Sequence, residues 1–379
     1  MRANSRVIAT HVALLEQWPD LTDAAVVGLD LRGLSLDLSV ALVHGAVFLG
    51  CAFPDGLAEQ LATRGAATLS GLGSVPFQVY RSALYSPEEL AAGHENGLEG
   101  TLDARITRWF DSSSSSSLPD LVVRALHDAT IDAAVAQFVL GRRVVGVMGG
   151  HALSRDDPAY RDVAVLGREL SRVGFTVATG GGPGVMEAAN LGAWCAPMGD
   201  DVLDQALTVL SRSPVYPADH DGYVRRALEV RNTWPNGGVS LGVPTWVYAD
   251  EPTGGFASHI AKYFTNSVRE DGLLAIARSG VVYAPGGAGT EQEIFTDTAQ
   301  NSLTLYGVRS PMVFLGSTYF GTEHADLIGA ARRQATAFGW DQLIAVCDDP
   351  RHAVTFITEH DPDGAGAAGV ERRRTHQDP

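Results

Sequence analysis

The chain has 379 residues, 45% of them hydrophobic and 19% charged, which is typical of a globular protein with one large or two ordinary domains. Its 44 acidic and 28 basic residues give a net charge of −16, which disfavours nucleic acid and anionic membranes as partners. The three cysteines form no CxxC pair, which argues against a disulfide framework or a cysteine-based zinc site. Without a signal-peptide pattern or an apolar run of membrane-spanning length, we expect a cytoplasmic protein.

The N-terminal part is the hardest to interpret. Residues 26–34 and 45–51 predict short strands, and we expect residues 1–111 to form a small accessory α/β domain. Leucines alternate from Leu29 to Leu38, which hints at a pentapeptide-like coil but is too short to establish a repeat.

Two tracts of low complexity bound the rest of the chain. Asp111 is followed by six serines, which cannot bury apolar surface and predict a linker or loop over residues 112–118. Residues 361–379 are rich in glycine and alanine and then charged, and we expect them to form a disordered tail. The main domain is therefore predicted over residues 119–360.

Within this domain, apolar strands alternate with amphipathic helices. Such a pattern predicts an α/β fold with a doubly wound parallel sheet of Rossmann type, covered by helices on both faces. The expected strands lie at 143–149, 174–179, 239–247, 281–284, 312–315 and 343–346. Ligands of such sheets bind at the carboxyl ends of the strands, and two glycine clusters fall there.

The second cluster, from Pro285 to Glu293, follows a strand and opens a helix. Glycines let successive backbone N–H groups converge on an anion, and the positive end of the helix dipole favours a phosphate. On this motif alone, a tight turn is the better interpretation, because Thr290 and Glu293 also have the spacing of a capping box.

The first cluster, Gly180 to Gly184, strengthens the case for a ligand because it ends a neighbouring strand. It is not a good dinucleotide fingerprint, since it follows the second strand rather than the first.

A third element of interest precedes the second glycine cluster in the sequence. Phe256, Ile260 and Phe264 recur at helical spacing, and Arg269 lies beyond them, either in a surface ion pair or facing the cleft.

Both glycine clusters and Arg269, in this order and spacing, resemble the LONELY GUY (LOG) family of phosphoribohydrolases, formerly labelled lysine decarboxylases. The resemblance covers roughly residues 140–345 and rests on GGGPGVMEAAN from Gly180 and on PGGAGTEQE from Pro285. Around Arg269 the chain reads Ser-Val-Arg-Glu where the plant pattern is His-x-Arg-Lys, which is closer to longer bacterial members with an added N-terminal domain.

The resemblance implies hydrolysis of the N-glycosidic bond of nucleoside 5′-monophosphates, either AMP-like or cytokinin-type, to free base and ribose 5-phosphate. Such cleavage passes through an oxocarbenium-like state that a carboxylate can stabilise. Glu293 is the candidate catalytic carboxylate, and Arg269 is expected to hold the phosphate or orient Glu293. The expected phosphate- and substrate-binding residues are Gly286, Gly287, Gly289 and Thr290, with Gly181, Gly182, Gly184, Glu187 and Asn190 from the first cluster; Glu187 and Asn190 are equally compatible with ordinary first-turn residues.

Two other functions remain open. One is a non-catalytic nucleotide- or cofactor-binding protein of the same fold, and the other is a nucleoside (deoxy)ribosyltransferase. A pyridoxal enzyme is rejected because Lys262, the single lysine, is predicted inside an amphipathic helix without a phosphate loop. We expect no cofactor. We also expect no metal, since His220 and His259 lack partners at ligand spacing. By analogy with the family, we expect a homodimer or higher homo-oligomer.

Overall fold

The computed structural model describes residues 6–37, 40–69, 75–112, 118–248 and 251–362. The chain divides into two compact units, each built from two stretches of sequence. The first unit comprises residues 1–83 and 108–134, and the second comprises residues 84–107 and 135–379. Two helices, α4 (Leu102–Ser112) and α5 (Leu118–Val139), pass from one unit to the other. The predicted linker lies outside the described residues from 113 to 117, and so does the predicted tail from 363 onward.

The first unit contains a small parallel sheet whose strands pair in chain order. Within the described residues the order is β1-β2-β3-β4, with Val7 opposite Ala25, Ala25 opposite Val47 and Val47 opposite Ala67. Its elements are β1 (Val7–Ile8), α1 (His11–Gln17), β2 (Ala25–Val27), β3 (Val47–Leu49), α2 (Leu57–Thr63) and β4 (Ala67–Leu69).

Each strand of this sheet lies beside the next along the chain, as in stacked coils rather than a doubly wound sheet. Leu29 and Leu31 are buried in the core of these coils, while Leu34 packs against it and is partly buried. The leucine alternation therefore marks an inward-facing row, although Leu38 lies outside the described residues.

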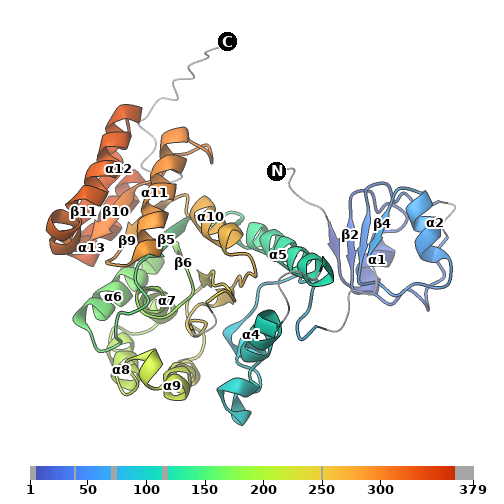
Figure 1. Ribbon diagram of the computed structural model, residues 1–379, viewed down its shortest axis with the longest axis horizontal. Helices are drawn as coiled ribbons and strands as arrows, with labels where there is room; N and C mark the ends of the chain where they lie inside the picture. Colours follow the sequence, from blue (N-terminus) through green and yellow to red (C-terminus); the bar gives the residue numbers. More distant parts are fainter. Residues whose placement is uncertain (1–5, 38–39, 70–74, 113–117, 249–250, 363–379) are drawn as a thin grey trace. The chain divides into compact units, whose positions relative to one another are not determined.

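The second unit is built on a sheet of seven parallel strands in the described chain, in the order β11-β10-β9-β5-β6-β7-β8 (Figure 1). The strands are β5 (Val144–Met148), β6 (Thr176–Thr179), β7 (Ser240–Gly242), β8 (His259–Ile260), β9 (Gly280–Tyr283), β10 (Met312–Leu315) and β11 (Ile344–Cys347). Nearly all of their residues are buried, which explains the continuous Val/Ile/Leu strands of the sequence. The predicted fold class is confirmed.

Helices cover the sheet in two layers (Figure 1). α6 (Pro158–Arg172) and α7 (Val185–Cys195) pack tightly together and against β6, and α13 (Pro350–His360) packs beside α6. The other layer contains α10 (Asn266–Ile276), α11 (Ala288–Leu303) and α12 (Ala325–Phe338). This unit also contains the α-helices α3 (Pro87–Leu90), α8 (Val202–Leu210) and α9 (His220–Thr233).

The sheet has a topological switch point between β5 and β9. From β5 the chain builds outward through β6, β7 and β8, and it then returns to place β9 on the other side of β5. The loops after β5 and β9 leave in opposite directions, which opens a crevice at the carboxyl ends of these strands.

One predicted helix is absent. Phe256, Ile260 and Phe264 are buried as expected, but they lie in an extended segment around β8 rather than on a helix. The spacing of these residues led to the wrong prediction of a helix. Because β8 is very short, the buried residues around it do not show the strict alternation of a strand. Lys262 is consequently not a helical residue. The last residues of the domain also differ from the expected boundary, since Asp361 is buried and its carboxylate pairs with Arg143 at 2.7 Å.

Among the residues that the structure describes, no helix combines the length and the apolar character needed to cross a bilayer.

Candidate active site

A cleft of about 730 Å³ lies at the switch point of the second unit. Its lining comes from the loops after β5, β6, β7 and β9, from the segment after β8, from the start of α7, and from the first two turns of α10 and α11. The lining residues are Gly149, Gly150, His151, Ala152, Leu153, Gly180, Gly182, Met186, Pro244, Thr245, Tyr248, Glu251, Pro252, Thr253, Lys262, Arg269, Glu270, Pro285, Gly286, Gly287, Ala288, Gly289, Thr290 and Glu293.

The loop after β9 presents the N-terminus of α11 to this cleft. Gly287 is the N-cap, and no side chain caps the helix. The first backbone N–H groups, at Ala288, Gly289 and Thr290, therefore have no capping oxygen, and Gly287 to Gly289 are exposed. An anion placed here would accept hydrogen bonds from these groups and interact with the positive end of a 16-residue helix.

The predicted capping box is wrong. Because α11 begins at Ala288, Thr290 is the third helical residue and Glu293 lies in the second turn. Neither side chain is placed to cap the first turn, so Glu293 is available for another role.

Close backbone approach holds the loops around the cleft together. The N–H of Gly150 donates to the carbonyl of Pro285 at 2.9 Å, and the Tyr319 hydroxyl donates to the carbonyl of Gly286 at 2.7 Å. A Cβ on Gly286 would lie 2.2 Å from Oγ1 of Thr290 and 2.8 Å from the nitrogen of Gly150. Only glycine fits between the two loops, which fixes the entry to α11.

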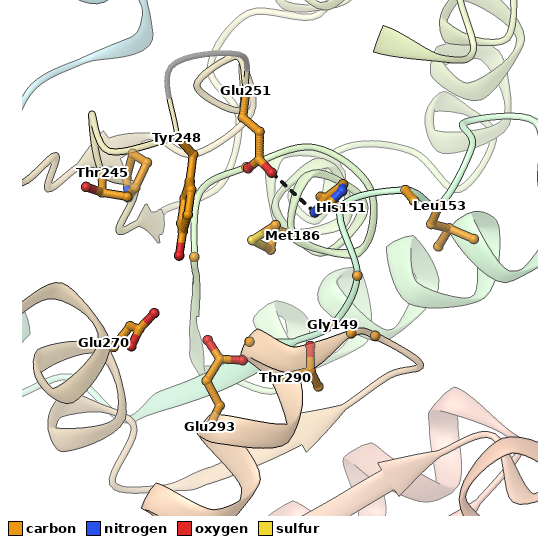
Figure 2. Close-up of a pocket in the computed structure, with 18 of the residues that line it drawn as sticks. Gly149, His151, Leu153, Met186, Thr245, Tyr248, Glu251, Glu270, Thr290 and Glu293 are labelled. Atoms are coloured by element: carbon orange, nitrogen blue, oxygen red, sulfur yellow. Dashed lines mark ion pairs between the residues drawn. The ribbon is translucent and has the colours of Figure 1, made fainter. Parts of the chain in front are cut away.

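Glu293 is half-buried, and its carboxylate points into the cleft (Figure 2). Within the described part of the chain, no side chain or backbone group hydrogen-bonds this carboxylate. Burial raises the pKa of Glu293 to about 7; the nearby Arg269 opposes this effect and the negative charge of Glu270 adds to it. A carboxyl group that titrates near neutrality is suited to proton transfer.

Arg269 comes from the first turn of α10 and is buried in the cleft wall. Its Nε donates to the carbonyl of Val243 at 2.7 Å, and one terminal nitrogen donates to the carbonyl of Gly180 at 3.2 Å. The guanidinium thus ties the ends of β6 and β7 together while its charge stays close to Glu293. Of the two positions considered from the sequence, Arg269 occupies the one in the cleft rather than the one in a surface ion pair.

The neighbouring Glu270 is a site residue that was not predicted from the sequence. Its carboxylate lines the cleft and accepts hydrogen bonds from Asn266 at 2.8 Å and from Gln292 at 2.5 Å. Figure 2 places it across from Glu293, so two carboxylates flank the same space.

The first glycine cluster divides between lining and packing. Gly180 and Gly182 line the cleft, whereas Gly181 and Gly184 do not. Gly184 has a φ of 68°, and a Cβ there would lie 2.5 Å from the carbonyl oxygen of Gly150. This glycine is required where the turn packs under the loop after β5.

Glu187 and Asn190 do not line the cleft, contrary to expectation. Glu187 is 1% exposed, and its carboxylate accepts hydrogen bonds from Arg155 at 2.6 and 2.9 Å, from Tyr160 at 2.8 Å and from Tyr223 at 2.6 Å. Asn190 is fully buried and donates to Oγ1 of Thr179 at 2.7 Å. The buried face of α7 points both residues away from the cleft and into the core.

Other lining residues were not predicted as site residues from the sequence. His151 lines the cleft, and its Nδ1 lies 3.2 Å from a carboxylate oxygen of Glu251. Trp246 packs in the core, whereas Tyr248 is half-exposed and borders the cleft (Figure 2). In the sequence, the glycine pair Gly149-Gly150 directly after the first strand could have indicated that the loop with His151 lies at the cleft.

Comparison with known proteins gives limited matches. No curated protein matches the chain. Among solved structures, a molybdenum cofactor binding protein from Rippkaea orientalis is 15% identical, with a TM-score of 0.35 over 57% of this chain and 95% of that one. A molybdenum cofactor carrier protein from Chlamydomonas reinhardtii is 17% identical, with a TM-score of 0.33 over 58% and 98% of the two chains.

The match to a protein family lies inside the second unit. It spans residues 142–196, which comprise β5, α6, β6, the first glycine cluster and α7, and it ends before the second glycine cluster. This segment is similar to the SLOG cluster4 family.

Proposed function

We propose that the cleft binds a nucleoside 5′-monophosphate and that the protein hydrolyses its N-glycosidic bond to a free base and ribose 5-phosphate. The observation that carries the proposal is the position of Glu293. Its carboxylate, which forms no hydrogen bond or ion pair among the described residues, enters the cleft from the same helix whose uncapped N-terminus opens there. One element thus supplies both an anion-binding end and an ionisable group one and a half turns away.

The 5′-phosphate would bind the backbone N–H groups at the start of α11. Gly287 and Gly289 leave room for the anion, and the helix dipole favours its charge. Binding of the 5′-phosphate, which does not take part in the reaction, would thus position the ribose above Glu293.

Glu293 would act on the anomeric carbon in two ways. Its negative charge stabilises the oxocarbenium-like transition state, and the carboxylate accepts a proton from the attacking water. Because burial raises the pKa of Glu293 to about 7, the carboxylate is a stronger base than an exposed glutamate and is still partly ionised at neutral pH. Arg269 would favour the ionised form of Glu293 and hold the adjoining strand ends in place.

The atoms and charges of this hydrolysis balance without a further reactant. Water adds its hydroxyl to C1′ of the ribose, the bond from C1′ to the base nitrogen breaks, and the base leaves with the proton that the water lost. No redox partner is needed. A nucleoside without the phosphate would lack the contact with α11 and would not be held in register.

The test is to incubate the protein with a panel of nucleoside 5′-monophosphates and, in parallel, with the matching nucleosides. We expect free base and ribose 5-phosphate, detected by chromatography, from the monophosphates alone. Equal release from nucleosides would contradict the phosphate site. Release that rises when an acceptor base is added, with a new nucleotide as product, would indicate a transferase instead.

A further inference from the structure

The single lysine of the chain is part of a buried cluster at the wall of the cleft. Lys262 is 3% exposed, and its Nζ donates to Oδ1 of Asp103 at 2.7 Å and to Oγ1 of Thr253 at 2.8 Å. Asp103 also accepts hydrogen bonds from Nε1 of Trp246 at 2.8 Å and from the Thr253 hydroxyl at 2.7 Å. The four side chains come from α4, from the loop after β7 and from the segment after β8, all within the second unit.

This cluster holds the wall of the cleft that lies opposite the α11 N-terminus. Thr245 forms a parallel bridge with Tyr263, which places Lys262 beside the strand end that carries Thr245. Thr245, Thr253 and Lys262 all line the cleft. Figure 2 shows Thr245 and Tyr248 on the far side of the cleft from Thr290 and Gly149. A nucleotide with its phosphate at α11 and its ribose near Glu293 would extend its base toward this wall.

The wall has spare hydrogen-bond donors. An ammonium group has three N–H bonds, and two of those on Lys262 are used by Asp103 and Thr253. Over the described residues, nothing accepts the third by hydrogen bonding; the ring of Trp246, with its centroid 5.1 Å from Nζ, attracts only the charge. The Thr245 oxygen accepts from the N–H of Val247 at 3.1 Å, which leaves its hydroxyl proton to donate.

We propose that Lys262 is the base-recognition residue of this cleft and that it selects bases with a carbonyl group over bases with an amino group at the same position. This inference rests on the proposed function. A carbonyl oxygen accepts the third N–H of Lys262, whereas an exocyclic amine presents its own protons to a positively charged donor. Asp103 and Thr253 fix the ammonium, so Lys262 cannot turn to suit the wrong base.

The size of the selection follows from the charge on the donor. A hydrogen bond from a charged group corresponds to about a 10- to 150-fold change in binding. A site built to donate also discriminates against a ligand that leaves its buried donor unpaired. The preferred substrates are therefore 6-oxopurine and 4-oxopyrimidine nucleoside monophosphates.

Inosine and adenosine 5′-monophosphate test this inference because they differ in the group at C6 of the purine. We expect kcat/KM to be at least about 10-fold higher for the inosine compound. Uridine and cytidine 5′-monophosphate form a second pair that differs at C4 of the pyrimidine. Equal kcat/KM within each pair, or a preference for the amino bases, would overturn the assignment of Lys262.

Two variants separate recognition from structural support. Lys262→Met keeps the apolar stem and removes the ammonium, and we expect the inosine-to-adenosine ratio of kcat/KM to fall toward one. Because this change leaves the Asp103 charge buried without its partner, the double variant Asp103→Asn with Lys262→Met removes both charges and should show the same loss of selectivity. An unchanged ratio with lower activity on both substrates would show that the cluster only supports the fold.

Binding distinguishes failure of this inference from failure of the proposed function. If no monophosphate releases a base, the hydrolase proposal fails, and the shift in Tm caused by each nucleotide then measures recognition alone. A larger shift with the inosine than with the adenosine compound, lost in Lys262→Met, would still support the role of Lys262. Equal shifts would contradict it.

Discussion

The two glycine clusters of the second unit look alike in sequence and differ in the structure. The cluster after β6, from Gly180 to Gly184, is buried throughout and packs beneath the loop after β5. The cluster after β9, around Gly286 to Gly289, is largely exposed and opens a helix into the cleft. Glycine serves close packing in one cluster and leaves backbone donors accessible in the other. A glycine-rich turn therefore identifies a ligand site only when its N–H groups are left without partners.

The largest effect on stability is expected from the buried hydrogen-bond network of Glu187, which lies beneath the first glycine cluster. Glu187 accepts four hydrogen bonds in full burial, and its loss leaves the Arg155 charge unpaired. We expect Glu187→Ala to lower the free energy of unfolding by about 3–5 kcal/mol, measured by urea denaturation. Glu187→Gln, which keeps the shape and one acceptor oxygen, should lose less. A loss below about 1 kcal/mol in the alanine variant would mean that the network is not a support.

The same substitution in each cluster sharpens the comparison. Gly184→Ala places a Cβ against the backbone of the loop after β5 at a positive φ, and we expect a loss of roughly 2–4 kcal/mol. Gly289→Ala meets nothing within 4 Å and lies in the first turn of α11, so we expect no loss and a gain of at most about 1 kcal/mol. Thermal unfolding of both variants measures the difference. Similar losses at both positions would remove the distinction between packing and open glycines.

The pH dependence of stability tests the burial of Glu293. Its pKa is raised to about 7 in the folded protein, so the folded state binds a proton more tightly than the unfolded state between about pH 4.5 and 7. The contribution of Glu293 to stability therefore falls as pH rises through this range. We expect Glu293→Gln to be more stable than the natural protein by roughly 1–3 kcal/mol at pH 8 and equally stable at pH 4. A difference that does not change with pH would contradict the raised pKa.

A charge at the open cluster should affect the ligand rather than the fold. Gly289→Asp adds a negative charge at the start of α11, which interacts favourably with the helix dipole but repels a phosphate. We expect Tm to stay the same or rise slightly, and KM for a nucleoside monophosphate to rise about 10-fold. Gly289→Asn is the matched neutral control and should change KM less. An equal effect of the two substitutions would indicate steric obstruction rather than charge.

Much of the second unit follows from its sequence. Strands buried on both faces leave continuous apolar runs, so β5, β6, β9, β10 and β11 were predicted close to their observed bounds. The segment around β8 was mistaken for a helix because a two-residue strand carries no period of its own. The stacked coils of the first unit were only suggested by leucines, since each coil is short and its strands have two or three residues.

The candidate site was predictable where a family resemblance supported a motif. That resemblance implied one site for the second glycine cluster, Arg269 and Glu293, and all three line the same cleft in the structure. Glu187 and Lys262 were misplaced because their surroundings depend on long-range contacts, with Arg155 for the first and with Asp103 for the second. Sequence spacing gives no information about such partners.

The central claim is that Glu293 acts chemically on a nucleoside 5′-monophosphate, and it is tested most directly by Glu293→Gln. We expect kcat for base release to fall by about 10²- to 10⁴-fold, with KM for the monophosphate nearly unchanged, because the phosphate contacts remain. Glu291→Gln is the matched control, since Glu291 lies in the first turn of the same helix but does not line the cleft. It should retain full activity. Full activity in Glu293→Gln as well would contradict the proposed function of Glu293.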